Sequence, residues 1–125
     1  MFDIPDLMRV AQDLARHASA RQAVIAENIA QANTPGFRAR DLPAFGAQTE
    51  TMHLAATRPA HLNADRSPPR FAPQIDRGAP SFAPNGNTVS LEREMMRAVQ
   101  TRQSHEMALA TYSSARNILR SALGQ

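Results

Sequence analysis

Histidine is the side chain best suited to acid–base catalysis or metal binding near neutral pH, and this sequence has four of them. They are His17, His53, His61 and His105. Their spacing fits no metal-binding motif, and no Glu-bearing helix motif surrounds them. The chain has no Cys, which excludes thiolate metal sites and disulfides.

Two further kinds of chemistry also lack support in the sequence. The five Gly are isolated, so there is no glycine-rich loop that would bind a phosphate. No Ser lies in a nucleophile elbow, and scattered Ser, His and Asp do not by themselves define a catalytic triad. We therefore expect no enzyme activity, no metal, no cofactor and no small-molecule substrate.

The basic residues are all Arg, and they are spread along the whole chain. Fourteen Arg against 11 Asp and Glu give a formal net charge of +3. A nucleic-acid-binding surface normally concentrates its basic residues on one face or arm. The scattered Arg favour protein partners, because the planar guanidinium suits ion pairs at packed interfaces. The alternative is a basic helical module that binds nucleic acid or an anionic membrane surface, with binding that weakens steeply with salt.

Proline divides the chain into three segments, because eight of the nine Pro lie between Pro35 and Pro84. Apolar residues recur every three or four positions between residues 6 and 32, which predicts an amphipathic N-terminal helix over 1–33. Pro35 disfavours helix at the residue before it, and Thr34-Pro35-Gly36-Phe37 has the composition of a type II turn. We expect an irregular or extended Pro-rich segment over 34–87, followed by a C-terminal helix over 88–125.

The C-terminal helix has a heptad pattern, with Ser90 as its expected N-cap and with Glu92 and Glu94 in its first turn. The pattern predicts that this helix pairs with the N-terminal helix in a coiled-coil-like hairpin. We weigh two roles for the polar residues on or beside the predicted seams. They pair across subunits and fix the register of the helices, or they extend to water from a slightly rotated helix. These residues are Arg21, Asn28, Arg102, His105 and Arg116. The predicted seam of the C-terminal helix is Leu91, Met95, Ala98, Arg102, His105, Leu109, Tyr112, Arg116, Leu119 and Leu123.

The sequence offers little for a large independent core. Leu, Ile, Val and Phe make up 23 of the 125 residues, a share below the roughly 20% that distinguishes chains able to bury a large core. Two helices built largely on Ala and Met bury too little apolar surface to offset the entropy of ordering them. We expect a marginally stable monomer that is stabilised when neighbouring copies cover its remaining apolar faces.

Two sequence blocks carry a resemblance to a known family. The segment Arg21–Phe45 reads RQAVIAENIAQANTPGFRARDLPAF and resembles the N-terminal signature of bacterial flagellar rod and hook axial proteins. That signature is an Asn-Ile-Ala-Asn stretch closed by Thr-Pro-Gly and an aromatic residue, and Gln31 stands here where the family usually has its second Asn. The second block, Gly86–Met96, resembles the start of the C-terminal helix in the short proximal rod proteins of this family. The positions assigned to the family motif are Asn28, Ile29, Asn33, Thr34, Pro35, Gly36, Phe37, Arg40, Asp41, Asn87, Val89, Ser90 and Glu92, with Ser90 where the family often has Asp.

The resemblance implies a mainly α structural subunit of the proximal rod of the flagellar basal body, with its two terminal helices paired in a helical tubular assembly. Such a subunit transmits torque and connects the membrane-embedded MS ring and export gate to the rest of the rod. The implied partners are further copies of the chain, the adaptor FliE, the MS-ring protein FliF, and the rod proteins FlgC and FlgF.

The resemblance also implies a route to the periplasm through the flagellar type III export apparatus. The first ten residues lack the positive region and apolar run of a cleavable leader, which agrees with that route. Phe71-Ala72-Pro73-Gln74-Ile75 resembles an export-gate recognition pattern, in which Phe is followed after three residues by an apolar one. A pattern this short also arises by chance.

Overall fold

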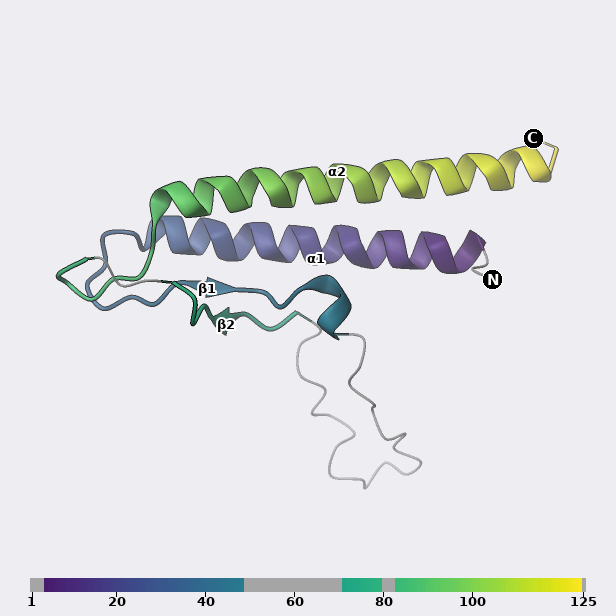
Figure 1. Cartoon of the computed structure of the whole chain (residues 1–125). Helices are drawn as coiled ribbons and strands as arrows, with labels where there is room; N and C mark the ends of the chain where they lie inside the picture. The colour runs from purple at the N-terminus through teal and green to yellow at the C-terminus, as the bar shows by residue number, and fades with distance from the viewer. Residues whose placement is uncertain (1–3, 49–70, 80–82, 125) are drawn as a thin grey trace, which may run out of the picture.

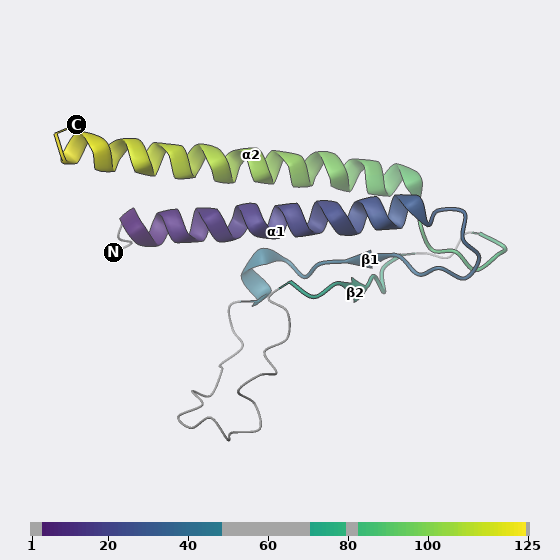
Figure 2. The same ribbon diagram turned by 180° about the vertical axis from the view of Figure 1, so that it is seen from behind.

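The computed structural model describes residues 4–48, 71–79 and 83–124. Two long helices, α1 (Ile4–Ala30) and α2 (Leu91–Ala122), lie side by side and run in opposite directions (Figures 1 and 2). Beside α1 lies a small antiparallel ribbon of β1 (Arg40–Asp41) and β2 (Gln74–Ile75), followed along the chain from β1 by a short 3₁₀ helix, η1 (Phe45–Gln48). The mainly helical class with two long terminal helices is therefore confirmed.

The two helices meet along rows of small side chains. From α1 the row includes Ala11, Ala18 and Ile25, and from α2 it includes Ala108 and Ala115, all 4% exposed or less. Each row repeats every seven residues, which is the spacing of a coiled-coil contact. Because alanine projects little beyond the backbone, it permits the two helices to approach closely while burying little apolar area.

The predicted seam of α2 is wrong in one of its two rows. The buried residues of α2 are Glu94, Thr101, Ala108 and Ala115, which lie one position before the predicted row. That predicted row points to solvent instead, because a shift of one residue turns a helix face by about 100°. The half-buried neighbours of the contact belong to the other predicted row: Ala98, His105, Tyr112 and Leu119. The exposed members of the predicted row are Met95, Arg102, Leu109, Arg116 and Leu123.

The turn after α1 has the predicted form. Gly36 has a φ of +71°, and the N–H of Phe37 donates to the carbonyl of Thr34 over 3.3 Å. A type II turn requires a positive φ at this position, which glycine adopts without strain. The helix itself ends at Ala30, slightly earlier than the sequence predicts. Tighter turns follow the helix, and in one of them the N–H of Ala32 donates to the carbonyl of Ile29.

Ser90 occupies the expected N-cap position of α2 but does not cap the helix with its side chain. Its backbone is extended, as at a typical cap, and its hydroxyl makes no capping hydrogen bond. Its carbonyl accepts the first helical bond, from the N–H of Glu94 at 2.9 Å. The prediction of a side-chain cap is therefore wrong. The helix begins directly after the expected cap residue and lies within the expected segment 88–125.

One histidine fastens the middle segment to α1. The Nε2 atom of His17 lies 2.9 Å from the carbonyl oxygen of Pro43, and the rings of Phe45 and Phe71 meet its imidazole edge-on at 5.7 and 5.3 Å between centroids. These contacts bring the two sides of the middle segment together on α1. Phe82, like His53 and His61, lies outside the described residues.

We predict that Gly36→Val destabilises the folded chain by about 1–3 kcal/mol, because a β-branched residue must then adopt a positive φ. Thermal or urea unfolding followed by circular dichroism measures the loss. The matched control is Gly46→Val, since a Cβ at either glycine meets nothing within 4 Å and Gly46 has no positive φ. Equal stability of the Gly36 and Gly46 variants contradicts the assigned role of the turn.

Candidate functional site

Asn28 is the most thoroughly enclosed polar residue of α1, with 0% exposure. Its Nδ2 donates to the carbonyl of Arg40 at 2.7 Å and to Oε2 of Glu94 at 3.0 Å. Its Oδ1 accepts the N–H of Arg40 at 3.0 Å. One amide therefore joins α1, β1 and α2, and it satisfies the backbone of Arg40 as a neighbouring strand would.

Asn87 joins the end of α1 to the start of α2 in a similar way. Its Nδ2 lies 2.8–3.0 Å from the carbonyls of Gln31, Ala32 and Thr34, while its Oδ1 accepts the N–H of Val89 at 2.7 Å. The last carbonyls of a helix have no partner within the helix. A side chain from 56 residues further along the sequence supplies that partner here, so Asn87 closes the end of the hairpin.

The backbones before β1 and before α2 also bond to each other. The N–H of Gly36 donates to the carbonyl of Asn85 at 3.0 Å, and the N–H of Thr88 donates to the carbonyl of Phe37 at 3.1 Å. The hydroxyl of Thr88 accepts the N–H of Ala39 at 2.9 Å. These bonds place the two sequence blocks of the family signature side by side.

A network of ion pairs lies between the ribbon and both helices. Arg21 donates to both carboxylate oxygens of Asp41, at 2.8 and 2.7 Å. Arg97 donates to Asp76 at 2.6 Å and to Glu94 at 3.1 Å, and its Nη2 lies 3.9 Å from Asp41. We use the term junction network for the side chains that connect α1, β1, β2 and α2 at this point: Arg21, Asn28, Asp41, Asp76, Arg93, Glu94 and Arg97.

The junction network alters the proton affinity of its acids. Desolvation by burial acts to raise the pKa of Asp41, but the hydrogen bond and charge of Arg21, the N–H of Leu42 and the charge of Arg97 outweigh it, so this pKa is lowered. The pKa of Asp76 is likewise lowered, because burial is outweighed by Arg97 and by the N–H of Gly78, with a smaller effect of Arg93.

Arg97 responds to the same contacts in the opposite sense. Burial acts to lower the pKa of Arg97, but the hydrogen bond that Arg97 donates to Asp76 and the charges of Asp41, Asp76 and Glu94 together raise it. Asp41, Asp76 and Arg97 therefore remain charged near neutral pH, and each of the two aspartates faces a guanidinium.

This arrangement suits structural support. Every carboxylate of the junction network is paired with an arginine, and within the part of the chain that the structure describes no group of three or more His, Asp or Glu is placed to bind a metal ion. Neither described helix has an apolar stretch long enough to cross a membrane.

The structure brings some of the predicted site residues together and leaves others on the surface. Arg21, Asn28, Asp41 and Asn87 all lie at the closed end of the hairpin, and the backbone of Arg40 lies with them. Arg102 and Arg116 are exposed, and Arg102 pairs along its own helix with Glu106 at 3.0 Å. The other signature positions at the surface are Ile29, Asn33, Thr34, Pro35 and Glu92, while Phe37, Val89 and Ser90 are half-buried.

Sequence reasoning missed the side chains that complete the junction network. Glu94 was expected to act on the helix dipole, but it is 2% exposed and bonds to Asn28 and Arg97. Asp76, Arg93 and Arg97 were not singled out. The spacing Arg93-Glu94-x-x-Arg97 puts the acid next to Arg97 on one helix face, and it was the one available signal.

The comparisons with known proteins agree with this reading. The profile of the family described as Flagella basal body rod protein matches residues 8–38. The chain is 31% identical to the Flagellar basal body rod protein FlgB of Agrobacterium fabrum over 107 residues, covering 81% of this chain and 80% of that protein. It is 29% identical to FlgB of Escherichia coli over 85% of this chain and 84% of that protein, and 31% identical to FlgB of Yersinia ruckeri over 70% and 71%.

A hairpin of two long helices, closed by a fully paired polar junction, defines a structural subunit. The relatives are named as rod proteins of the flagellar basal body, which are structural parts and not enzymes. The chain belongs to the FlgB family of flagellar basal body rod proteins. It is therefore a structural subunit of the flagellar basal body rod, where it assembles with copies of itself and with other basal-body proteins.

We predict that Asn28→Ala lowers the free energy of unfolding by about 3 kcal/mol, because it leaves the N–H of Arg40 and the buried Glu94 without their amide partner. Chemical unfolding of the purified chain measures the difference. Asn33→Ala removes an asparagine of the same signature that is exposed, and it serves as the control. A loss under about 0.5 kcal/mol for Asn28→Ala, in the range of ordinary surface substitutions, contradicts the role given to this amide.

The lowered pKa values of Asp41 and Asp76 predict a loss of stability in acid. Their pKa values lie below the ordinary 3.8 in the folded chain, so the ion pairs contribute fully above that pH and are lost as the pH falls through the folded pKa values. Melting temperatures measured from pH 7 downward record this, and Asp76→Asn reduces the pH dependence. Asp6→Asn is the control at pH 7, because its ion pair with Arg9 is exposed and contributes little. A pH dependence in Asp76→Asn equal to that of the unsubstituted chain contradicts the assignment.

Proposed function

We propose that this chain is a subunit of the proximal rod, in which the α1–α2 hairpins of many copies stand side by side in the wall of a helical tube. The division into terminal helical segments, 1–33 and 88–125, and a connecting Pro-rich segment, 34–87, belongs to this proposal. The hairpins form the tube, and the connecting segment extends from it or crosses to a neighbour. Contacts between different surfaces of successive copies generate an open helical array.

The observation that carries this proposal is the exposed apolar surface of α2. Small side chains of α2 face α1, while most of its large apolar ones face solvent. Met96 and Val99 are 61% and 69% exposed. The other large exposed apolar residues of α2 are Leu91, Met95, Met107, Leu109 and Ile118, and Leu123 follows directly after the helix. Apolar surface on this scale is typical of protein interfaces. Covering it in an assembly supplies the burial that the alanine contact between α1 and α2 lacks.

The specific partners in this proposal are those implied by the family resemblance. Within the rod they are further copies and the neighbouring rod proteins FlgC and FlgF. At the membrane end they are the adaptor FliE and the MS-ring protein FliF, through which the rod connects to the ring and the export gate. The flagellar type III export apparatus delivers the chain to the periplasm, and Phe71–Ile75 stays a predicted export signal.

Torque transmission in this proposal depends on stiff subunits with fixed register. The junction network ties both helices to the ribbon with charge-assisted hydrogen bonds, which are stronger and more directional than neutral ones. Arg102 and Arg116 are exposed on α2 beside its apolar residues, and His105 is half-buried. These three are the residues of α2 that we propose pair across subunits and set the register, whereas Arg21 acts within the subunit through Asp41.

We predict that Met96→Glu together with Val99→Glu abolishes assembly while the isolated chain still folds. Both side chains are exposed, so charge there costs the monomer little but becomes buried and unpaired at an interface. Circular dichroism checks the fold, and swimming in soft agar checks the rod in a strain that depends on this chain.

The matched control is Gln12→Glu together with Gln22→Glu, which adds the same charge on the exposed face of α1. Swimming at normal rates by the Met96/Val99 variant contradicts the proposal that this surface is covered in the rod. Equal loss of swimming by both double variants also contradicts it, because added charge on either helix would then be enough.

A further inference from the structure

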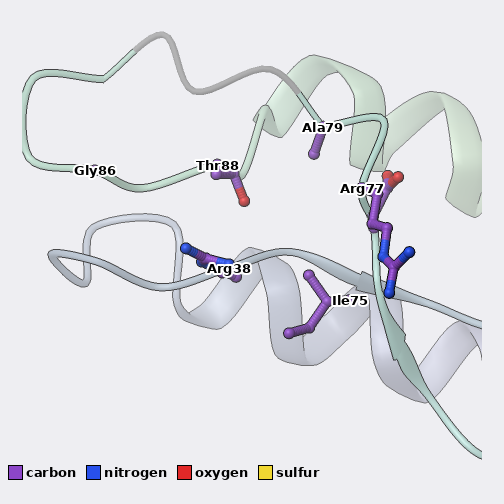
Figure 3. A pocket seen from close by; sticks show the side chains of 7 residues that line it. Arg38, Ile75, Arg77, Ala79, Gly86 and Thr88 are labelled. Carbon is purple, nitrogen blue, oxygen red and sulfur yellow. The ribbon is translucent and has the colours of Figure 1, made fainter.

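The outward face of the β ribbon combines an apolar side chain with two arginines that have no partner. Arg38 and Arg77 make no ion pair or hydrogen bond to any described residue. With Ile75, which is 53% exposed, they line an open hollow of about 500 Å³. Asp76 also lines this hollow, but its carboxylate is paired with Arg93 and Arg97. Figure 3 shows Ile75 between the two arginines, with Thr88 and Gly86 on the neighbouring segment. We call Arg38, Ile75 and Arg77 the arginine face.

The ribbon separates its charges by side. Along β1 the buried Ala39 and half-buried Asp41 alternate with the exposed Arg38 and Arg40, as strand geometry requires. The acids of the inner side are neutralised by the junction network. No carboxylate of the described chain neutralises the arginine face, so its positive charge is available to an external anion.

The backbone of β2 is also open at this face. Arg40 is paired with Ile75 in the ribbon. In the neighbouring pair, the N–H of Asp76 donates to the carbonyl of Ala39. The N–H and carbonyl of Arg40 turn away from β2 and bond to Asn28. Arg40 and Ile75 therefore form a non-hydrogen-bonded pair of the antiparallel ladder. In such a pair the N–H and carbonyl of Ile75 point away from β1, toward the outer edge of the ribbon. Ile75 thus offers a donor and an acceptor to an extended segment at the outer edge.

A second copy of this chain is a poor match for the arginine face. Among the described residues, Glu92 is the one side-chain carboxylate without an ion pair or hydrogen bond, whereas the whole chain has a net charge of +3. Like charges at an interface oppose association, and complementary charge favours it. The described part of a second copy thus offers one unpaired carboxylate for two arginines, which favours an occupant that brings its own.

We propose that the arginine face docks an extended acidic segment of a different protein, which adds to the edge of β2. Its carboxylates pair with Arg38 and Arg77, an apolar side chain between them covers Ile75, and its backbone bonds to Ile75. The proposal names a class of partner for the rod subunit and so rests on the proposed function. The surface is separate from the exposed apolar residues of α2, so the two are tested by different variants.

The test uses the full chain and a labelled Glu-Leu-Glu-Leu-Glu peptide, with binding followed by fluorescence anisotropy at low and high salt. Arg38→Gln together with Arg77→Gln weakens binding roughly tenfold, the effect of two exposed ion pairs. The control, Arg9→Gln together with Arg120→Gln, removes the same charge from two exposed arginines of α1 and α2 to which no binding role is assigned. It leaves peptide binding unchanged.

Two altered peptides test the chemistry of docking. Gln-Leu-Gln-Leu-Gln binds more weakly than the acidic peptide because it lacks charge. The acidic peptide with a methylated central amide also binds more weakly, because it lacks the N–H that reaches the carbonyl of Ile75. Equal binding of the uncharged peptide overturns the charge pairing, and equal binding of the methylated one overturns addition to β2.

Three other outcomes overturn the proposal. Equal loss of peptide binding in the two arginine double variants shows attraction by net charge alone. Binding of phosphatidylglycerol vesicles that requires Arg38 and Arg77, without peptide binding, makes the face a membrane contact. Loss of self-association by the Arg38/Arg77 variant in sedimentation makes the occupant a second copy. If that variant loses the peptide but still self-associates, the docking proposal stands whatever the Met96/Val99 variant does to the rod.

Discussion

The structure depends on a buried amide of α1 that bonds to β1 and α2 at once. A hairpin of two helices that meet through alanine has little apolar area to fix the position of one helix along the other. Asn28 supplies that information, because its hydrogen bonds to Arg40 and Glu94 form in one register only. A shift of either helix by one residue would leave a buried amide and a buried carboxylate unpaired, at a cost of several kcal/mol. Polar groups thus determine the register of a contact whose apolar groups determine only its face.

The distribution of apolar size across α2 explains why the subunit has a small core. Alanine and threonine, with Glu94 at the junction, occupy the contact with α1, while Met96 and Val99 are at least 61% exposed. Apolar residues in a monomeric protein normally lie inside, and large contiguous exposed groups of them mark binding surfaces. The α1–α2 contact therefore holds the two helices close together while burying little apolar surface. The large apolar side chains remain available for contacts with other chains.

The parts of the fold that are local in sequence were predictable. Pro35 and Gly36 determine their turn through backbone geometry alone, and the length of α2 follows from the absence of Pro and Gly within it. The seam was mispredicted because large apolar residues were taken as its markers, whereas the buried row consists of Glu94, Thr101 and two alanines. The ribbon and the junction network depend on residues such as Asp41 and Asp76, which are far apart in sequence. Such pairings need knowledge of which segments meet, and the periodicity of one helix does not contain it.

Once the segments meet, the alternation of β1 has a further consequence. Strand geometry sends Asp41 toward Arg21 and Arg97 on the inner side, so Arg38 and Arg40 must point outward. The inner carboxylates stabilise the subunit, but they are then too fully engaged with their own arginines to neutralise the outer ones. The outward arginines contribute little to the folded chain, since Arg40 has one exposed ion pair at 3.5 Å and Arg38 has none to any residue that the structure describes. Arg38 and Arg40 alternate along the chain with the buried Ala39 and the paired Asp41. The strand thus places the side chains that support the fold on one side and those available to another molecule on the other.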